Sequence, residues 1–111
     1  MKYILTTVCL MFLISFNLQA QNNPIIKGWY ADPEGIKYGD TYWVFPTYSA
    51  KYNEQVFFDA FSSKDLVKWE KHHDILDTAA VKWAKRAMWA PAVLQKGGKY
   101  YFFFAANDLP C

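Results

Sequence analysis

Two short stretches carry the side chains best suited to chemistry. In Gly28-Trp29-Tyr30-Ala31-Asp32-Pro33, a carboxylate stands between an aromatic pair and a proline. A carboxylate can exchange a proton or accept hydrogen bonds, although an Asp-Pro pair is also ordinary turn material. In Met88-Trp89-Ala90-Pro91, the indole offers a flat apolar face and an N–H donor. Such a face stacks well on a sugar ring and is equally suited to core packing, so residue type alone leaves both alternatives open.

The charged and imidazole side chains nearby are less specific. Arg86 precedes Trp89 and could reach the polar rim of a substrate, with ordinary surface charge as the alternative. Met88 opens the same stretch and is a further candidate contact. His72 and His73 are adjacent in a strand-like run, so their side chains face opposite sides, and no cluster of metal ligands accompanies them. We therefore predict no metal site and a solvated surface position for both histidines.

The elements that must position these residues are mostly strands. β-Branched and aromatic runs flank Gly39-Asp40 and again Gly97-Gly98, which predicts two hairpins. The spacing of apolar residues over 80–88 fits a short helix that Asp77 or Thr78 could cap and Pro91 would end, with a loop as the alternative. The expected strands cover residues 36–38, 41–45, 56–63, 67–71, 92–94 and 100–104.

The second hairpin repeats the first. Placing Pro91 on Pro33, an offset of 58 residues, aligns the hairpin glycines and the aromatic strands without a gap. Repeats of this size with about four strands each are typical of propeller blades, with a chance likeness of two aromatic hairpins as the alternative. Ala90 then takes the place of Asp32, and a departure from a structural pattern favours a functional role for that acid. Pro33 is expected to hold the backbone extended at Asp32.

The amino-terminal segment indicates the compartment. Lys2, an apolar run over 4–16 and the small residue Ala20 are typical of a secretory signal peptide, so we assign residues 1–20 to a signal and 21–111 to the mature domain. The run is shorter than the roughly 20 apolar residues of a membrane span, although an uncleaved anchor is the alternative. We expect a secreted or periplasmic protein with no membrane association after cleavage.

Charge and cysteine content argue against a nucleic-acid-binding protein and against a domain held together by an internal disulfide. Loss of Lys2 with the signal lowers the formal net charge from +2 to +1, which is too close to neutral for a nucleic-acid partner. Cys9 also leaves with the signal, and Cys111 is the last residue, so an intramolecular disulfide is not available.

The ordered motifs of the chain resemble the opening of glycoside hydrolase family 43. Each motif alone is weak, but all occur in the family's order, and the resemblance covers essentially the whole mature chain. They are Asn23-Pro24, Ala31-Asp32-Pro33, the run from Ser63 to Trp69, Trp89-Ala90-Pro91, and the run from Gly98 to Tyr101.

The resemblance implies a five-bladed β-propeller, of which this chain holds the first blade and half of the second. It implies an inverting glycoside hydrolase, such as an arabinofuranosidase, arabinanase or xylosidase, that acts on arabinose- or xylose-containing plant polysaccharides or oligosaccharides. Asp32 would be the general base, and Trp89, Arg86 and Met88 would contact substrate. The family's general acid and its tuning aspartate are expected beyond residue 111, so this chain is expected to be an incomplete fragment that is inactive alone.

Two other functions are compatible with the same sequence. A non-catalytic carbohydrate-binding propeller would use Asp32 only to hydrogen-bond sugar hydroxyls, and an interaction scaffold would have no sugar site. No cofactor is required, although family members often hold a calcium ion on the axis and a structural calcium is compatible with the full-length protein. Carboxylates at the axial ends of later blades would distinguish an enzyme from a binding module.

Overall fold

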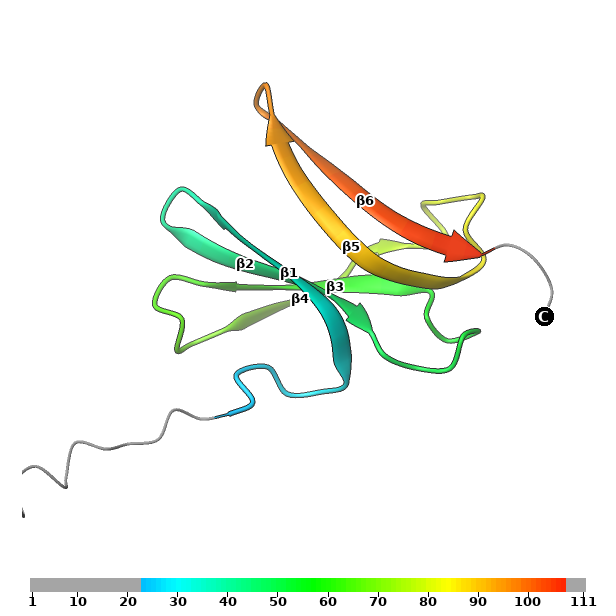
Figure 1. Cartoon of the computed structure of the whole chain (residues 1–111), viewed down its shortest axis with the longest axis horizontal. Coiled ribbons are helices and arrows are strands. Elements are labelled where there is room, and N and C mark those ends of the chain that lie inside the picture. The colour runs from blue at the N-terminus through cyan, green and yellow to red at the C-terminus, as the bar shows by residue number, and fades with distance from the viewer. Residues whose placement is uncertain (1–22, 108–111) are drawn as a thin grey trace, which may run out of the picture.

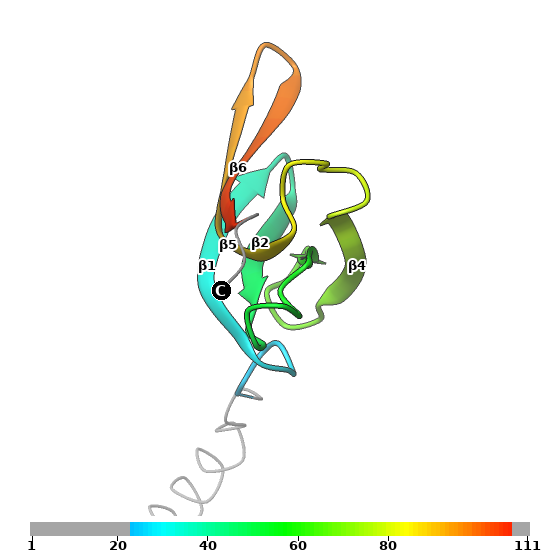
Figure 2. The same cartoon turned by 90° about the vertical axis from the view of Figure 1, so that its right-hand side faces the viewer.

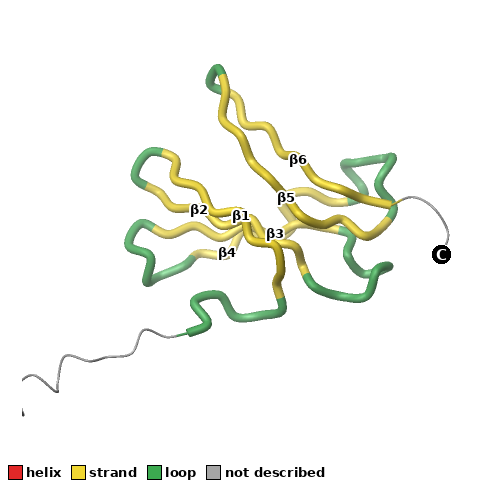
Figure 3. Tube along the Cα trace, in the orientation of Figure 1, coloured by secondary structure: helices red, strands yellow, loops and turns green. Residues whose placement is uncertain are grey.

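The computed structural model describes residues 23–107, and its regular elements are all strands (Figures 1 and 3). The strands are β1 (Tyr30–Tyr38), β2 (Thr41–Tyr48), β3 (Phe57–Ser63), β4 (Glu70–Asp77), β5 (Arg86–Lys96) and β6 (Lys99–Asn107). Strands β1 to β4 form an antiparallel sheet in chain order, and β5 and β6 form a separate two-stranded sheet. This is the all-β arrangement that the sequence predicts: one four-stranded unit followed by the first hairpin of another.

The hairpin turns follow the predicted glycines. Gly39 and Gly97 have φ angles of 60° and 58°, a left-handed conformation that glycine adopts without steric cost. They occupy equivalent places under the 58-residue offset, and the β5–β6 hairpin lies against the first sheet (Figure 2). The structure therefore confirms the two hairpins.

Each repeat also contains a β-bulge at the same place. In the first unit Asp32 and Pro33 stand opposite the single residue Pro46, and in the second unit Ala90 and Pro91 stand opposite Phe104. The φ angles are 46° at Asp32 and 48° at Ala90, so the expectation of an extended backbone at Asp32 is wrong. A bulge requires one residue to leave the extended region, and aspartate is among the residues that most readily accept a left-handed conformation.

Two apolar clusters join the hairpin to the sheet. Phe45, Ala60 and Val93 form the first cluster, and Phe58, Ala84 and Met88 form the second. Phe102 packs against both, in edge-on contact with Phe45 and Phe58. Burial of these side chains between the two sheets supplies the main driving force for packing the hairpin onto the sheet.

The expected helix over 80–88 is wrong, and the loop alternative is observed. Residues 78–85 form turns, and β5 begins at Arg86. Asp77 does cap the first turn, because its carboxylate accepts a hydrogen bond from the Ala80 amide at 2.8 Å. The chain then leaves helical geometry, since Ala87 has a φ of 50° and Arg86 pairs with Asn107 across the hairpin. Ala84 and Met88 have the spacing of residues on one face of a helix. In the structure Ala84 lies in a loop and Met88 in a strand, and both are buried in one cluster.

The predicted signal peptide over residues 1–20 lies outside the described residues. Within residues 23–107, no helix has the length and apolar character needed to cross a membrane.

Candidate active site

One end of the molecule gathers the predicted site residues. Strands β1 and β5 begin at this end, and strands β2 and β6 finish there, together with the loops over 49–56 and 78–85 (Figure 1). The opposite end carries the hairpin turns. Loop 49–56 is anchored to the start of β5, because the amide of Ala87 donates to the Tyr52 carbonyl at 3.0 Å and the amide of Met88 donates to the Gln55 carbonyl at 2.9 Å.

Asp32 is exposed at this end, on the bulge of β1. Its Oδ2 atom accepts a hydrogen bond from the Thr47 hydroxyl at 3.3 Å. The Thr47 oxygen in turn accepts a hydrogen bond from the Ala90 amide at 2.7 Å. Thr47 is 2% exposed. A buried hydroxyl thus connects the carboxylate of the first unit to the bulge of the second and leaves Oδ1 of Asp32 available to solvent.

Thr47 could have been found by the same signal that indicated Asp32. The repeat places Ala105 at the position of Thr47, just as it places Ala90 at the position of Asp32. The two polar departures from the repeat are therefore hydrogen-bonded to each other. A hydroxyl that donates to a carboxylate and accepts from a backbone amide fixes both its own rotamer and the position of that carboxylate.

Trp89 lies next to Ala90 and is 37% exposed. Its ring contacts Tyr52 edge to face, with centroids 5.3 Å apart. Tyr52 belongs to loop 49–56 and is also exposed, so the two rings form an aromatic surface beside the bulge. The structure thus brings Trp89 to the end of the molecule that carries Asp32.

Arg86 and Met88 have different environments. Met88 is fully buried in the cluster with Phe58 and Ala84, so the structure gives it a packing role and no surface for a ligand contact. Arg86 is half-buried at the start of β5, and its Nε atom has no hydrogen-bond partner among the described residues. A buried guanidinium donor of this kind is energetically costly and has the capacity to bind an acceptor.

A second polar network surrounds Asp59, a residue that no pattern in the sequence indicates. Its buried carboxylate accepts hydrogen bonds from Tyr30 at 2.7 Å and from the Asp74 amide at 3.0 Å, and it lies 2.9 Å from Lys71 and 2.6 Å from His73. Burial favours a raised pKa for the Asp59 carboxyl, but these hydrogen bonds outweigh it and lower the pKa from 3.8 to about 2. Asp59 is therefore a structural anion that ties β3 to β1 and β4.

The two histidines face opposite sides of β4, as predicted, but neither is simply solvated. His72 Nε2 lies 2.8 Å from the Ser62 hydroxyl, and its ring packs on Trp43. His73 lies on the other face against Asp59. Within residues 23–107, no group of three or more His, Cys, Asp or Glu side chains could hold a metal ion.

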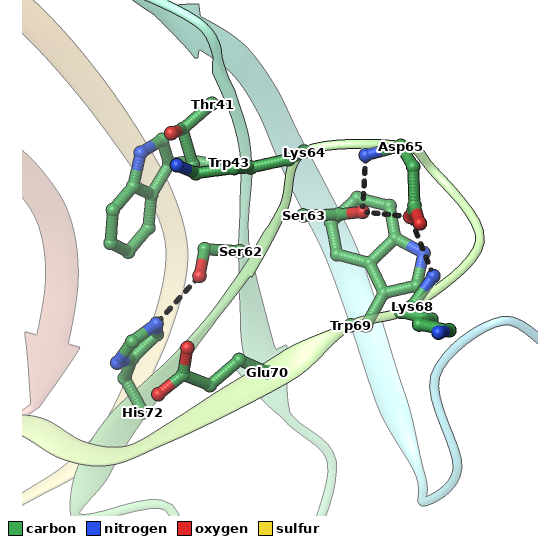
Figure 4. Close-up of a pocket in the computed structure, with 10 residues that line it drawn as sticks. All are labelled: Thr41, Trp43, Ser62, Ser63, Lys64, Asp65, Lys68, Trp69, Glu70 and His72. Atoms are coloured by element: carbon green, nitrogen blue, oxygen red, sulfur yellow. Dashed lines mark hydrogen bonds between the residues drawn. The ribbon is translucent and has the colours of Figure 1, made fainter.

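Figure 4 shows that the run from Ser63 to Trp69 forms a turn. Ser63 pairs with Tyr42 beside the β1–β2 turn, whereas the bulge at Asp32 stands opposite Pro46, toward the other end of β2. The Ser63 hydroxyl accepts from the Leu66 amide at 2.8 Å, and Asp65 Oδ1 accepts from the Lys68 amide at 2.8 Å. This motif stabilises the β3–β4 connection and lines a pocket with Trp43 and His72.

Comparison with known proteins decides the family. The sequence matches the family description "Glycosyl hydrolases family 43" over residues 21–110. The chain belongs to glycosyl hydrolase family 43. The beta-D-galactofuranosidase xynD of Aspergillus niger is 45% identical over 96 residues, which cover 78% of this chain and 28% of that protein.

Solved structures of family 43 proteins share the fold. The GH43_1 enzyme of Xanthomonas citri, solved in complex with xylose, superimposes with a TM-score of 0.67 at 24% identity over 75% of this chain and 26% of its own. A thermostable family-43 glycoside hydrolase gives a TM-score of 0.64 at 29% identity over 78% and 27% of the two chains. A beta-xylosidase/alpha-arabinofuranosidase from a compost microbial metagenome, in complex with xylotriose, gives a TM-score of 0.66 at 22% identity. The match covers 78% of this chain and 30% of that chain.

The family 43 chain described here is thus part of a β-propeller: one four-stranded blade and the first hairpin of the next. It spans between 26% and 30% of the length of these relatives.

Proposed function

We propose that this chain supplies the general base of an inverting family 43 glycoside hydrolase, and that Asp32 is that base. One observation carries the proposal: Asp32 is an exposed carboxylate, aimed by a bulge and held through one oxygen by Thr47, at the end of the propeller where Trp89 is also exposed. Bulges often re-aim a side chain beside an active site, and residues in sparsely populated backbone conformations are concentrated at such sites.

The geometry suits the activation of water. Thr47 donates to Oδ2, so Oδ1 is left to accept the proton of an attacking water. An inverting reaction also needs a carboxylic acid that protonates the leaving oxygen, roughly 6.5–9.5 Å from the base so that water fits between them. We assign that acid to a later blade, following the family resemblance, and to no residue of this chain.

Trp89 and Tyr52 are proposed as a wall of the sugar subsite. Their exposed rings offer apolar faces to the C–H groups of a sugar, and the indole N–H is available as a donor. The unpartnered Nε of Arg86 would donate to a sugar hydroxyl or to a carboxylate of a later blade. Met88 supports this wall from the core and does not contact substrate.

We propose arabinose- or xylose-containing polysaccharides or oligosaccharides of plant type as substrates. Neighbours solved in complex with xylose and xylotriose support a pentose, whereas the Aspergillus niger relative is a galactofuranosidase and supports a furanoside. The apolar run and small residue of the amino-terminal segment support export of the protein. A calcium ion takes no part in the proposed steps.

The proposal is tested by initial rates of the protein that carries all blades on aryl arabinofuranosides, xylosides and galactofuranosides. We expect turnover of at least one, with the anomeric configuration of the first-formed sugar inverted when followed by proton NMR. A retained configuration would contradict the water-activating role of Asp32. Saturable binding of oligosaccharides without turnover of any substrate would favour a non-catalytic carbohydrate-binding propeller instead.

A further inference from the structure

The strand segment that leads into the bulge at Asp32 has little backbone support. Before the bulge, β1 pairs with β2 at Tyr30 and Ala31, and the register then breaks. Among the described residues, the register of β2 on β3 extends from Tyr42 to Val44, on the turn side of the bulge. Backbone pairing therefore connects Tyr30 and Ala31 to β3 only through a part of β2 that lies beyond the bulge.

A side-chain hydrogen bond spans this gap. The Tyr30 hydroxyl donates to Oδ2 of Asp59 on β3 at 2.7 Å, across the intervening strand β2. Lys71 Nζ lies 2.9 Å from the same oxygen. Oδ1 of Asp59 lies 2.6 Å from His73 Nδ1 and accepts from the Asp74 amide at 3.0 Å, and both of these residues belong to β4. The buried carboxylate is thus fixed by β4 through one oxygen and holds Tyr30 through the other.

The ring of Tyr30 is fixed by packing as well. It is edge-on to Phe61, with centroids 5.2 Å apart. Gly28 passes close to the ring, because a Cβ atom at this position would lie 2.6 Å from Tyr30 Cε2. The carbonyl of Trp29 accepts from the Ser49 amide at 2.9 Å. Burial raises the pKa of the Tyr30 hydroxyl, so it stays a donor. All of these contacts lie within the first blade, and no other blade has to supply them.

We propose that Tyr30 is a positioning residue for Asp32 and that Asp59 is its anchor. The proposal rests on the proposed role of Asp32 as the general base. Thr47 holds the carboxylate of Asp32, whereas Tyr30 holds the backbone two residues before it. A base must lie within hydrogen-bond reach of its water, and a displacement of about 1 Å can slow a reaction by on the order of 10²-fold.

The test is a double-mutant cycle of Tyr30→Phe and Asp32→Asn in the protein that carries all blades, with a dinitrophenyl glycoside as substrate. Phenylalanine keeps the ring against Phe61 and removes only the hydroxyl. Tyr30→Phe alone should lower kcat on the order of tenfold and change KM by less than about twofold. In the Asp32→Asn background it should not lower the residual turnover further, because its effect passes through the base. Asp59→Asn, which weakens the anchor from the other side, should give the same pattern.

Two controls separate position from stability. Tyr38→Phe is the matched control: it removes a hydroxyl at the other end of β1 that has no hydrogen-bond partner within residues 23–107, and it should leave kcat unchanged. Gly39→Ala strains the adjacent turn, where φ is 60°, and should lower stability without lowering kcat. All variants are assayed below their unfolding midpoints, as measured by circular dichroism.

A parental kcat in both Tyr30→Phe and Asp59→Asn would overturn the proposal. An equal fold loss of turnover with and without the Asp32 carboxylate would also overturn it, since this indicates a general structural role, as would a change confined to KM. Parental turnover of Asp32→Asn alone would instead overturn the proposed function, so the two failures are distinguishable.

Discussion

At the scale of single residues, the proposed chemistry depends on Asp32 and the Thr47 hydroxyl that holds it. Asp32 could be predicted from the sequence because a carboxylate replaces the alanine of the repeat, and the structure adds Thr47 as its hydrogen-bond partner. Asp59 could not be predicted, because its partners lie 12 to 29 residues away along the chain and meet only once three strands are paired. The sequence predicts that Met88 contacts substrate, and the structure buries it. The reason is related: the local pattern does not show which side of a bulged strand faces the core.

Replacement of Thr47 by valine tests whether this residue positions the base. Val keeps the shape but leaves Asp32 without its donor and the Ala90 amide without its acceptor. In the protein that carries all blades we expect kcat to fall by about tenfold or more with KM little changed, since the lost hydrogen bonds are worth roughly 1–3 kcal/mol. Thr47→Ser should restore most of kcat. A Ser variant as impaired as the Val variant would indicate a packing role alone.

Asp59 offers a test of the structural network through pH. Its pKa is lowered from 3.8 to about 2, so the ionised carboxylate contributes stability above pH 3.8, and this contribution is lost as the pH falls through about 2. We expect the urea midpoint of unfolding of the parent protein to decrease over that pH range. The decrease should be smaller in Asp59→Asn, which has no carboxylate to protonate. This variant should already be less stable near neutral pH by on the order of 2 kcal/mol. Equal acid sensitivity of both proteins would contradict this role.

At the scale of elements, local sequence signals account for the predicted hairpins, and long-range strand pairing accounts for the features that differ from the predictions. Glycines, alternating aromatic residues and the 58-residue repeat predicted both hairpins, because those signals are local. The bulge at Asp32 was not predicted, since it requires knowledge of which residue on β2 stands opposite. The helix expected over 80–88 failed because long-range pairing of Arg86 with Asn107 and burial beside Phe58 override local apolar spacing.

Two glycines of the first hairpin give an element-scale test with opposite expected signs. Gly39 has a φ of 60°, so Gly39→Ala should destabilise the fold by roughly 1–2 kcal/mol because a Cβ atom is strained in this conformation. Gly35 has an ordinary φ and open space above it, so Gly35→Ala should be neutral or stabilising by up to about 1 kcal/mol. Chemical denaturation of both variants measures the difference. Equal effects would contradict the turn geometry assigned to Gly39.

At the scale of the whole molecule, the chain is a blade and a hairpin of a family 43 propeller that spans less than a third of its relatives. A propeller site is assembled from several blades around one axis. The sequence could therefore indicate a base and an aromatic wall, but the substrate depends on surfaces that residues 23–107 do not provide.

Residues 21–111 alone are expected to release no nitrophenol from aryl arabinofuranosides or xylosides. The reason is that a base without a correctly spaced carboxylic acid cannot assist departure of the leaving group. Release that scales with the concentration of the purified chain and disappears in Asp32→Asn would contradict the assignment of the acid to a later blade.

The role of Asp32 as the general base is tested by kcat of Asp32→Asn in the protein that carries all blades. The variant is measured on the best aryl glycoside, with oligosaccharide binding followed in parallel. Asparagine keeps the size and the contact with Thr47 but cannot take a proton from water. We expect a fall in kcat on the order of 10²- to 10⁴-fold with binding retained. Turnover at the parental rate would contradict the assignment of Asp32 as the general base.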